Sequence, residues 1–527
     1  MIAFSKERQT NWQALAMGAL SFAFAWACAE FVRQPEIASF ADDSVSYLVM
    51  AQVFAPWGHP SAAVASAFGQ EAAYPPLFPL VLAFSGAAYD IARAHLIEAL
   101  LLAGCLPLAY ILGRKWLESG WAALAAVAVT SSLPALWINA KGILSEPLYC
   151  ALLLAMLYLL ELAPSKGRSW ALALAMAALV LTRTAGFALV AAYGAWAISR
   201  REHSFSSRLR LAVPALVAVL AYGAWLALRP TQALDENAQV LSARLHVYFT
   251  DAAAWSGLVA SLARQANAMA EGWIGSLLIY WVEGRPLRPL LAGMLGVLAL
   301  AGLALRLRSG RADAWIMAAY LVTYLLWPFY DQMGRFLFPA LPVLVLYAFY
   351  AARAGARRLS RPPSLAYAIV GALAVSLSLP ALAFIRERSA APASYAQMTE
   401  WYRTADPRLA KARADVHLDL LTDMRAMRTL TPPGSKVMWV KPSYIALLAE
   451  REGIRAPDAR LSPEEYRRIV EASGADYVFL SVYDPRDTLS DAAWNAGMNA
   501  LDGRTKLIGV GKRSGTDSVA SALFQVR

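Results

Sequence analysis

Long apolar runs separated by short polar segments make up most of the first 385 residues. A helix of about 20 apolar residues spans the roughly 30 Å hydrocarbon core of a bilayer. Runs of this kind lie near residues 12–31, 92–112, 120–137, 143–162, 170–182, 186–198, 209–228, 288–305, 314–329, 336–351 and 365–385. The pattern therefore predicts an all-α polytopic membrane bundle of about 11 transmembrane helices.

The connections between these runs indicate an orientation. Basic segments such as "SRREHSFSSRLR" (199–210) and "ARAGARRLSRPP" (352–363) follow alternate pairs of runs, whereas the other connections carry few Lys or Arg. The positive-inside rule puts the basic loops and the N-terminus in the cytoplasm and the C-terminus outside. The runs 170–182 and 186–198 are short for spans, so they could be tilted, or one could be a broken helix. If the two together form one re-entrant piece, two crossings are lost at once and every later segment keeps its side.

The apolar runs become short and the charges frequent after residue 385. Short β-strands are predicted at 436–440, 476–482, 506–511 and 521–527, with helices over "SYIALLAEREG" and "SPEEYRRIVEASG". In the second helix Ser462 is a predicted N-cap and Glu465 completes a capping box. We therefore expect residues 1–385 to form the membrane domain and 386–527 a small extracytoplasmic α/β domain that supports or gates the site.

Composition agrees with a membrane protein, since 58% of the residues are hydrophobic and only 16% are charged. The net charge of +11 comes from basic clusters between apolar runs, which is not the basic face with stacking aromatics that binds nucleic acid. The cysteines, Cys28, Cys105 and Cys150, lie in apolar stretches without histidines at ligand spacing. Neither a disulfide framework nor a zinc site follows from them.

Two adjacent acids, Asp42 and Asp43, stand in the first external loop, residues 30–74. The segment after them has apolar residues at three- and four-residue steps, which predicts a helix lying on the membrane. Asp43 could cap this helix, but a cap explains one acid and not two. Adjacent carboxylates repel, so at least one should have a raised pKa unless a cation or metal compensates, and such a group can take a proton from a hydroxyl.

Other polar residues are predicted on the same external side, namely Tyr74, Glu146, Arg183 and Arg335. Acids and arginines at helix ends often only mark the membrane interface. The convergence of these residues on one side favours a common site instead.

Five segments in this order resemble the GT-C superfamily of polytopic glycosyltransferases: "DDSVSY" (42–47), "YPPLFPLVLA" (74–83), "SEPLY" (145–149), "LTRTAG" (181–186) and "GRFLFPALPVL" (334–344). The resemblance is to the bacterial branch related to protein O-mannosyltransferases and the lipid A aminoarabinose transferase. It implies an enzyme of the bacterial inner membrane that transfers a hexose or pentose from a polyprenyl-phosphate donor to a lipid, glycan or protein acceptor outside.

The resemblance also implies roles for the residues. Asp43, four residues before Tyr47, fits the base, with Asp42 as its neighbour, although the order Asp-Asp-Ser leaves open which Asp is the base. Glu146 resembles the second acid of these sites, which binds a metal or orients the acceptor. The resemblance thus implies a divalent metal ion held by Glu146 and Asp43 as one alternative. Arg183 and Arg335 are the predicted ligands of the lipid phosphate or, alternatively, interfacial anchors.

Tyr74 stands where the aminoarabinose enzymes carry a Lys before the Pro-Pro pair, which argues against that donor. The resulting prediction is an inverting transfer. A lipid-linked glycan flippase is the alternative from another class, but no internal repeat is visible. An oligosaccharide ligase with a diphosphate donor is a second alternative, because the external loop 229–287 is long and contains four arginines.

Overall fold

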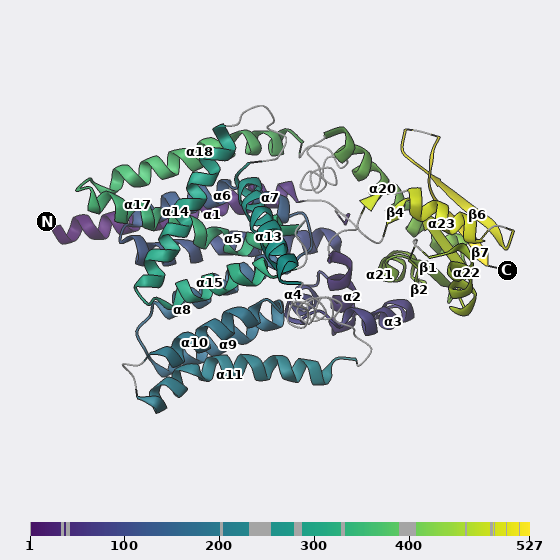
Figure 1. Ribbon diagram of the computed structural model, residues 1–527, viewed down its shortest axis with the longest axis horizontal. Coiled ribbons are helices and arrows are strands. Elements are labelled where there is room, and N and C mark those ends of the chain that lie inside the picture. The colour runs from purple at the N-terminus through teal and green to yellow at the C-terminus, as the bar shows by residue number, and fades with distance from the viewer. Residues whose placement is uncertain are drawn as a thin grey trace.

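The computed structural model describes residues 2–32, 36–37, 43–200, 204–230, 254–278, 287–327, 332–388, 407–458, 461–484, 488–489, 491–501, 503–515 and 517–526. A long helical bundle contains the N-terminus, and a smaller region of helices and strands contains the C-terminus at the opposite end (Figure 1). The predicted fold class, a helical membrane bundle with a small C-terminal α/β part, is confirmed.

The bundle consists of helices that run mainly along the long axis of the molecule (Figure 1). They are α1 (Ile2–Phe31), α5 (Ile91–Leu117), α6 (Gly120–Ser132), α7 (Pro134–Asn139), α8 (Glu146–Leu160), α9 (Lys166–Thr182), α10 (Gly186–Ser199), α11 (Phe205–Leu228), α13 (Ala254–Leu277), α14 (Leu287–Arg308), α15 (Ala312–Leu325), α16 (Met333–Leu337), η2 (Phe338–Ala340), α17 (Leu341–Arg358) and α18 (Pro363–Arg388). The predicted apolar runs fall on these helices, with 120–137 divided between α6 and α7.

Six helical segments in the described chain are long and apolar enough to cross a membrane. They are Asn11–Phe31, Ile91–Leu117, Phe205–Leu228, Leu287–Arg308, Met333–Arg358 and Pro363–Pro380. The helices α6, α8, α10 and α15 are apolar but shorter. The chain is therefore a multi-pass membrane protein, while the larger span count stays a prediction.

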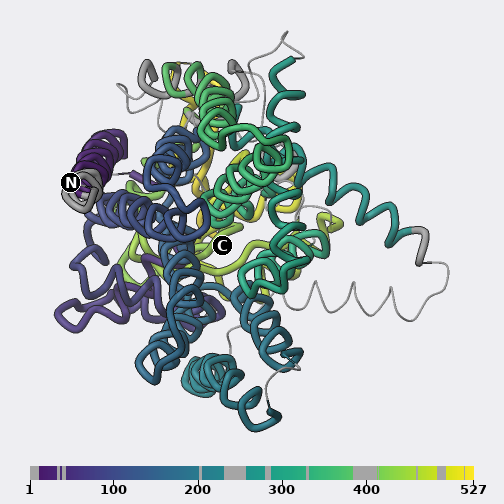
Figure 2. Tube along the Cα trace, turned by 90° about the vertical axis from the view of Figure 1, so that its left-hand side faces the viewer, coloured from purple at the N-terminus to yellow at the C-terminus, as the bar shows by residue number. Residues whose placement is uncertain are grey.

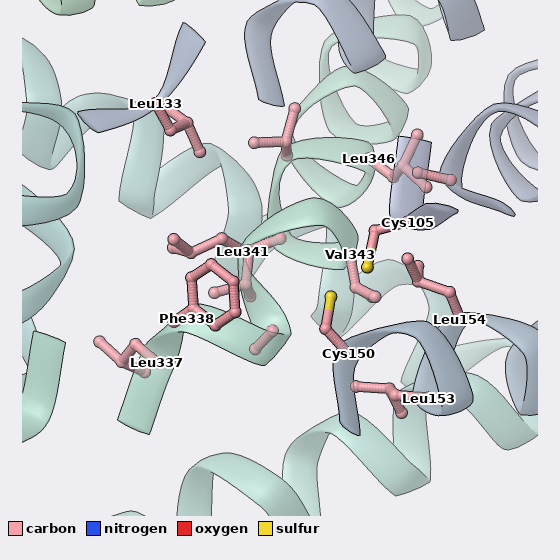
Figure 3. Packing of buried hydrophobic residues seen from close by; sticks show 14 of the residues in the cluster. Cys105, Leu133, Cys150, Leu153, Leu154, Leu337, Phe338, Leu341, Val343 and Leu346 are labelled. Atoms are coloured by element: carbon pink, nitrogen blue, oxygen red, sulfur yellow. The ribbon is translucent and has the colours of Figure 1, made fainter. Parts of the chain in front are cut away.

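The centre of the bundle is packed with apolar side chains from helices far apart in the sequence (Figure 3). Cys105 on α5 lies beside Cys150 on α8, and its thiol contacts the Pro147 carbonyl at 3.7 Å. All three cysteines are free and buried. Close packing of this kind fixes the N-terminal ends of α8 and α17, and these ends carry Glu146 and, through α16, Arg335.

The segment predicted as the first external loop, residues 30–74, contains two short helices, α2 (Ser44–Phe54) and α3 (Ala62–Glu71), and a third, α4 (Leu77–Phe84), follows it. The helix predicted after the acid pair is present as α2, but its predicted position is wrong. Its side chains, including Leu48 and Val49, are buried inside the protein instead of facing lipid. The three- and four-residue spacing requires an apolar neighbour, and it does not distinguish protein from lipid.

The C-terminal region is built on a five-stranded sheet in the order β2-β1-β3-β7-β6. Its elements are α20 (Pro407–Leu430), β1 (Lys436–Trp439), α21 (Pro442–Tyr444), η3 (Ile445–Ala449), β2 (Glu452–Arg455), α22 (Pro463–Ala472), β3 (Tyr477–Ser481), β4 (Tyr483–Asp484), β5 (Thr488–Leu489), α23 (Asp491–Leu501), β6 (Thr505–Lys512) and β7 (Val519–Val526). β1 is parallel to β2 and β3, and the other sheet pairs are antiparallel.

Several predictions for this region are confirmed. The strands lie where expected, and the Ser462 hydroxyl caps α22 by accepting the Glu465 amide. The helix predicted over "SYIALLAEREG" is wrong in its second half, because helical structure ends at Ala449 and the chain turns into β2. Glu450 adopts a left-handed backbone, with φ of 54°, at this turn.

The C-terminal region packs against α2 and α4 through one shared apolar cluster. The cluster includes Leu48 of α2 and Phe78 of α4 on one side and Leu420 of α20 and Tyr444 of α21 on the other. In the view from the N-terminal end of the bundle, the yellow C-terminal strands lie behind the helices (Figure 2). The predicted boundary at residue 385 falls near the end of α18, and residues 389–406 lie outside the described chain.

Candidate active site

The structure brings six of the predicted site residues into one cluster where the ends of several bundle helices meet residues 43–74. They are Asp43, Tyr47, Tyr74, Glu146, Arg183 and Arg335. The seventh, Asp42, lies outside the described residues. The prediction that these residues converge is thus met by every member that the structure describes.

Asp43 directs its carboxylate into this cluster instead of capping α2. It occupies the N-cap position, but its side chain makes no capping hydrogen bond among the described residues. Oδ1 accepts the Tyr74 hydroxyl at 3.0 Å, and Oδ2 pairs with Arg335 Nη2 at 2.5 Å. Desolvation alone would raise the pKa of Asp43, but the charge and hydrogen bond of Arg335 outweigh it and hold that pKa below its ordinary value.

Glu146 is the first residue of α8, where the helix dipole favours a negative charge. Its side chain is only 1% exposed. Oε1 pairs with Arg183 Nη1 at 2.8 Å and also accepts a hydrogen bond from Arg335 Nε. The other oxygen, Oε2, is buried and has no hydrogen-bond partner among the described residues.

Arg183 owes its position to the break between two helices. It is the C-cap of α9, with an extended backbone, and α10 begins three residues later at Gly186. Its Nη1 also donates to the Ser145 hydroxyl at 3.0 Å, and this hydroxyl lies 2.9 Å from the Tyr47 hydroxyl. The two short runs at 170–182 and 186–198 are therefore separate helices with Arg183 at their junction.

The four charged groups alternate in sign. Arg335 joins Asp43 to Glu146, and Glu146 joins Arg335 to Arg183, so two carboxylates are balanced by two guanidinium groups. Moving such charges out of water costs more than the pairing commonly returns. Clusters of this kind therefore contribute little to stability and are typical of sites that bind a charged substrate.

The predicted metal ligands do not fit a divalent ion as they are arranged. Asp43 and Glu146 are both bonded to Arg335, whose positive charge stands where a cation would bind. Within the described residues no group of three or more His, Cys, Asp or Glu could hold a metal ion. The metal stays a prediction, and no step below is assigned to one.

Sequence reasoning did not connect to the cluster the polar residues that support it. The Ser44 hydroxyl accepts the Ile143 amide at 3.0 Å, and Glu98 Oε1 accepts the Leu144 amide at 3.0 Å. These bonds fix the turn before Glu146. Ser145 could have been found from its place beside Glu146, whereas the partners of Ser44 and Glu98 are distant in sequence.

Known proteins resemble this chain in structure and not in sequence. No known family profile matches the chain, and no curated protein does. ArnT from Cupriavidus metallidurans in the apo state is similar at a TM-score of 0.53 and 13% identity, over 98% of both chains. ArnT bound to undecaprenyl phosphate is similar at a TM-score of 0.51 and 14% identity, again over 98% of both.

A second relative is the archaeal oligosaccharyltransferase AglB from Archaeoglobus fulgidus, in complex with an inhibitory peptide and a dolichol-phosphate. Its TM-score is 0.52 at 13% identity, over 96% of this chain and 80% of that one. Both relatives are GT-C glycosyltransferases. The chain has the GT-C fold. The similarity extends over the bundle and the C-terminal region together, because nearly the whole chain is covered.

Proposed function

We propose that this GT-C protein is an integral-membrane glycosyltransferase. It moves a hexose or pentose from a polyprenyl-phosphate donor to an acceptor on the extracytoplasmic face, with inversion at the anomeric carbon. The observation that carries the proposal is the arrangement of Asp43, which lies between the hydroxyl of Tyr74 and the guanidinium of Arg335. The Asp43 carboxylate thus lies between a tyrosine of the first external loop and a pair of arginines that are suited to bind a phosphate.

The similar proteins support the donor class. The ArnT structure contains undecaprenyl phosphate, and the AglB structure contains a dolichol-phosphate. A lipid phosphate of this kind is confined to the plane of the membrane by its tail. Because the lipid is already confined to the plane of the membrane beside the site, less entropy is lost when it binds.

The reaction is a single displacement. The acceptor oxygen forms a bond to the anomeric carbon while its proton passes to the Asp43 carboxylate. The bond from that carbon to the phosphate oxygen breaks, and its electron pair leaves on the phosphate. Arg183 and Arg335 stabilise the departing phosphate, and Glu146 keeps both guanidinium groups oriented between turnovers. Attack opposite to the leaving group inverts the sugar.

The test is transfer of radiolabelled sugar from a panel of polyprenyl-phosphate hexoses and pentoses in membranes that contain the wild type, Asp43→Asn or Asp42→Asn. We expect wild-type transfer and a loss of about 10²- to 10⁴-fold in Asp43→Asn, as for removal of a general base. Lipid, glycan and protein fractions are counted separately, which identifies the acceptor class.

Other outcomes of this assay would contradict the proposal. Lipid that crosses the bilayer without a new glycosidic bond would indicate a flippase, and transfer only from a diphosphate donor would indicate a ligase. Full activity in Asp43→Asn would show that Asp43 is not the general base. The metal prediction is tested in the same membranes, since loss of transfer in EDTA that Mg²⁺ or Mn²⁺ restores would place a divalent ion beside the arginines.

A further inference from the structure

A second carboxyl group, Glu71, lies next to the proposed site and belongs to none of its predicted residues. It is the last residue of α3, an end where the helix dipole disfavours a negative charge. Tyr74, whose hydroxyl binds Asp43, follows in the same turn, with its amide donating to the Glu71 carbonyl at 3.1 Å. An acidic residue at this end does not stabilise the helix, so the helix itself does not explain why Glu71 is there.

Glu71 is held by a hydroxyl group from another part of the fold. The Ser46 hydroxyl of α2 also lies near its carboxyl group. Ser443 of α21 donates to Oε1 from 372 residues later in the chain. Ser443 is 6% exposed, so this bond forms inside the junction between the first external loop and the C-terminal region.

Ser443 comes from the edge of the sheet where α/β domains commonly bind ligands. Residues 441–444 directly follow β1, which is parallel to both of its neighbours. The carboxyl ends of parallel strands meet at one edge, and ligands bind outside that edge in open α/β sheets. Through Ser443, this edge contacts Glu71.

The polar groups form a sequence in space with Asp43 in the middle. Arg335 contacts one oxygen of Asp43 and Tyr74 contacts the other, and the Glu71 carboxyl group is near enough to Asp43 and Tyr74 for charge interactions with both. In a displacement the leaving group and the attacking group occupy opposite sides of the reacting carbon. With the arginines on the leaving-group side, the acceptor belongs on the side of Glu71.

We infer that Glu71 is a substrate-contacting residue that accepts a hydrogen bond from the acceptor, and that Ser443 is its positioning residue. The inference rests on the proposed transferase function. It gives the C-terminal region a part in the reaction, because the acceptor is a hydroxyl-bearing molecule held between the first external loop and the turn after β1.

The ionisation of Glu71 supplies a specific readout. Desolvation raises its pKa, while the hydroxyls of Ser443 and Ser46 act in the opposite direction. The ionised carboxylate of Glu71 accepts a stronger hydrogen bond than the protonated acid does, so the rate rises as the pH passes through its pKa. The acid side of the pH–rate profile then has two limbs, one for Asp43 and one for Glu71. The limb at higher pH is due to Glu71, because the pKa of Asp43 is held low. The charged or titratable groups on elements around Glu71 are Asp43, Tyr47, Tyr74, Arg229, Lys441, Tyr444, Glu452 and Arg455.

The experiment compares Glu71→Gln and Ser443→Ala with the wild type as full-length protein in membranes. We expect Glu71→Gln to reduce transfer about 10- to 100-fold, as for loss of a hydrogen bond to a charged group, with unchanged binding of undecaprenyl phosphate. Ser443→Ala removes a bond that lowers the pKa of Glu71, so its acid limb moves to higher pH. Ser443→Thr keeps the hydroxyl and restores the wild-type profile.

The matched control is Ser521→Ala. Ser521 is also a buried serine that donates to a carboxylate of the C-terminal region, Asp423, at 2.6 Å, but it lies away from the site. It should change neither transfer nor pH profile. An infrared titration of the Glu71 carboxyl, taken as wild type minus Glu71→Gln, gives a midpoint that should be higher in Ser443→Ala.

The outcomes separate this inference from the proposed function. No transfer by the wild type overturns the transferase proposal and the acceptor role with it. Wild-type transfer with full activity in Glu71→Gln overturns the acceptor role alone. An unshifted infrared midpoint in Ser443→Ala overturns the positioning role, and weaker undecaprenyl phosphate binding in Glu71→Gln would place Glu71 on the donor side.

Discussion

At the scale of single residues, the pairing of Asp43 with Arg335 has a consequence for donor binding. A phosphate that enters the site must compete with Asp43 for this guanidinium. Asp43→Asn removes the competing charge, so we expect it to bind undecaprenyl phosphate a few-fold to about tenfold more tightly while it fails to transfer sugar. The measurement is a binding isotherm with purified protein in detergent.

Tyr74→Phe is the control for this prediction. It removes the hydroxyl that binds Oδ1 of Asp43 but leaves the ion pair with Arg335, so lipid affinity should not change. Arg335→Ala should weaken binding instead. Equal or weaker binding by Asp43→Asn would show that Arg335 does not exchange its carboxylate partner for the phosphate.

The charged members of the site could be chosen from the sequence, because Asp43, Glu146, Arg183 and Arg335 interrupt apolar surroundings on one side of the predicted membrane. The sequence could not show which carboxylate pairs with which arginine, since several pairings balance the same charges. Glu71 was passed over for a related reason. Its partner Ser443 is 372 residues away, and no local pattern connects them.

At the scale of elements, the apolar runs predicted the bundle helices well, but an apolar pattern did not show whether protein or lipid covers a helix. α2 is buried by protein, although its pattern equally suits a membrane surface. α13, within the predicted loop 229–287, was missed. Its Trp273 indole donates to the Ala292 carbonyl of α14 at 2.8 Å, so tertiary contacts hold a helix whose polar residues suggested a loop.

The junction of α9 and α10 also belongs to this scale, because it places Arg183. At Gly186 a Cβ would lie 2.9 Å from the backbone carbon of Leu179, in the last turn of α9. Gly186→Ala should therefore open the junction, lower the thermal midpoint and weaken undecaprenyl phosphate binding about tenfold. Thermal unfolding and the same lipid isotherm measure both effects.

Gly194→Ala is the matched control on α10. There a Cβ meets only the side chain of Ala215 at 3.8 Å, an ordinary contact, so neither stability nor binding should fall. A Gly186→Ala protein that unfolds and binds lipid like the wild type would mean that the close approach of the two helices does not determine the position of Arg183.

At the scale of the whole molecule, the site and the C-terminal region must share one side of the membrane, because Ser443 contacts Glu71 and Arg425 pairs with Glu36 at 2.8 Å. Charge predicts that this side is extracytoplasmic. We expect Asp517→Cys, at a fully exposed C-terminal position, to react with a membrane-impermeant maleimide in spheroplasts. Ser309→Cys, exposed between α14 and α15, should react only after lysis. The native cysteines are buried and give little background. The reverse pattern would put Asp43 on the cytoplasmic side and exclude transfer to an external acceptor.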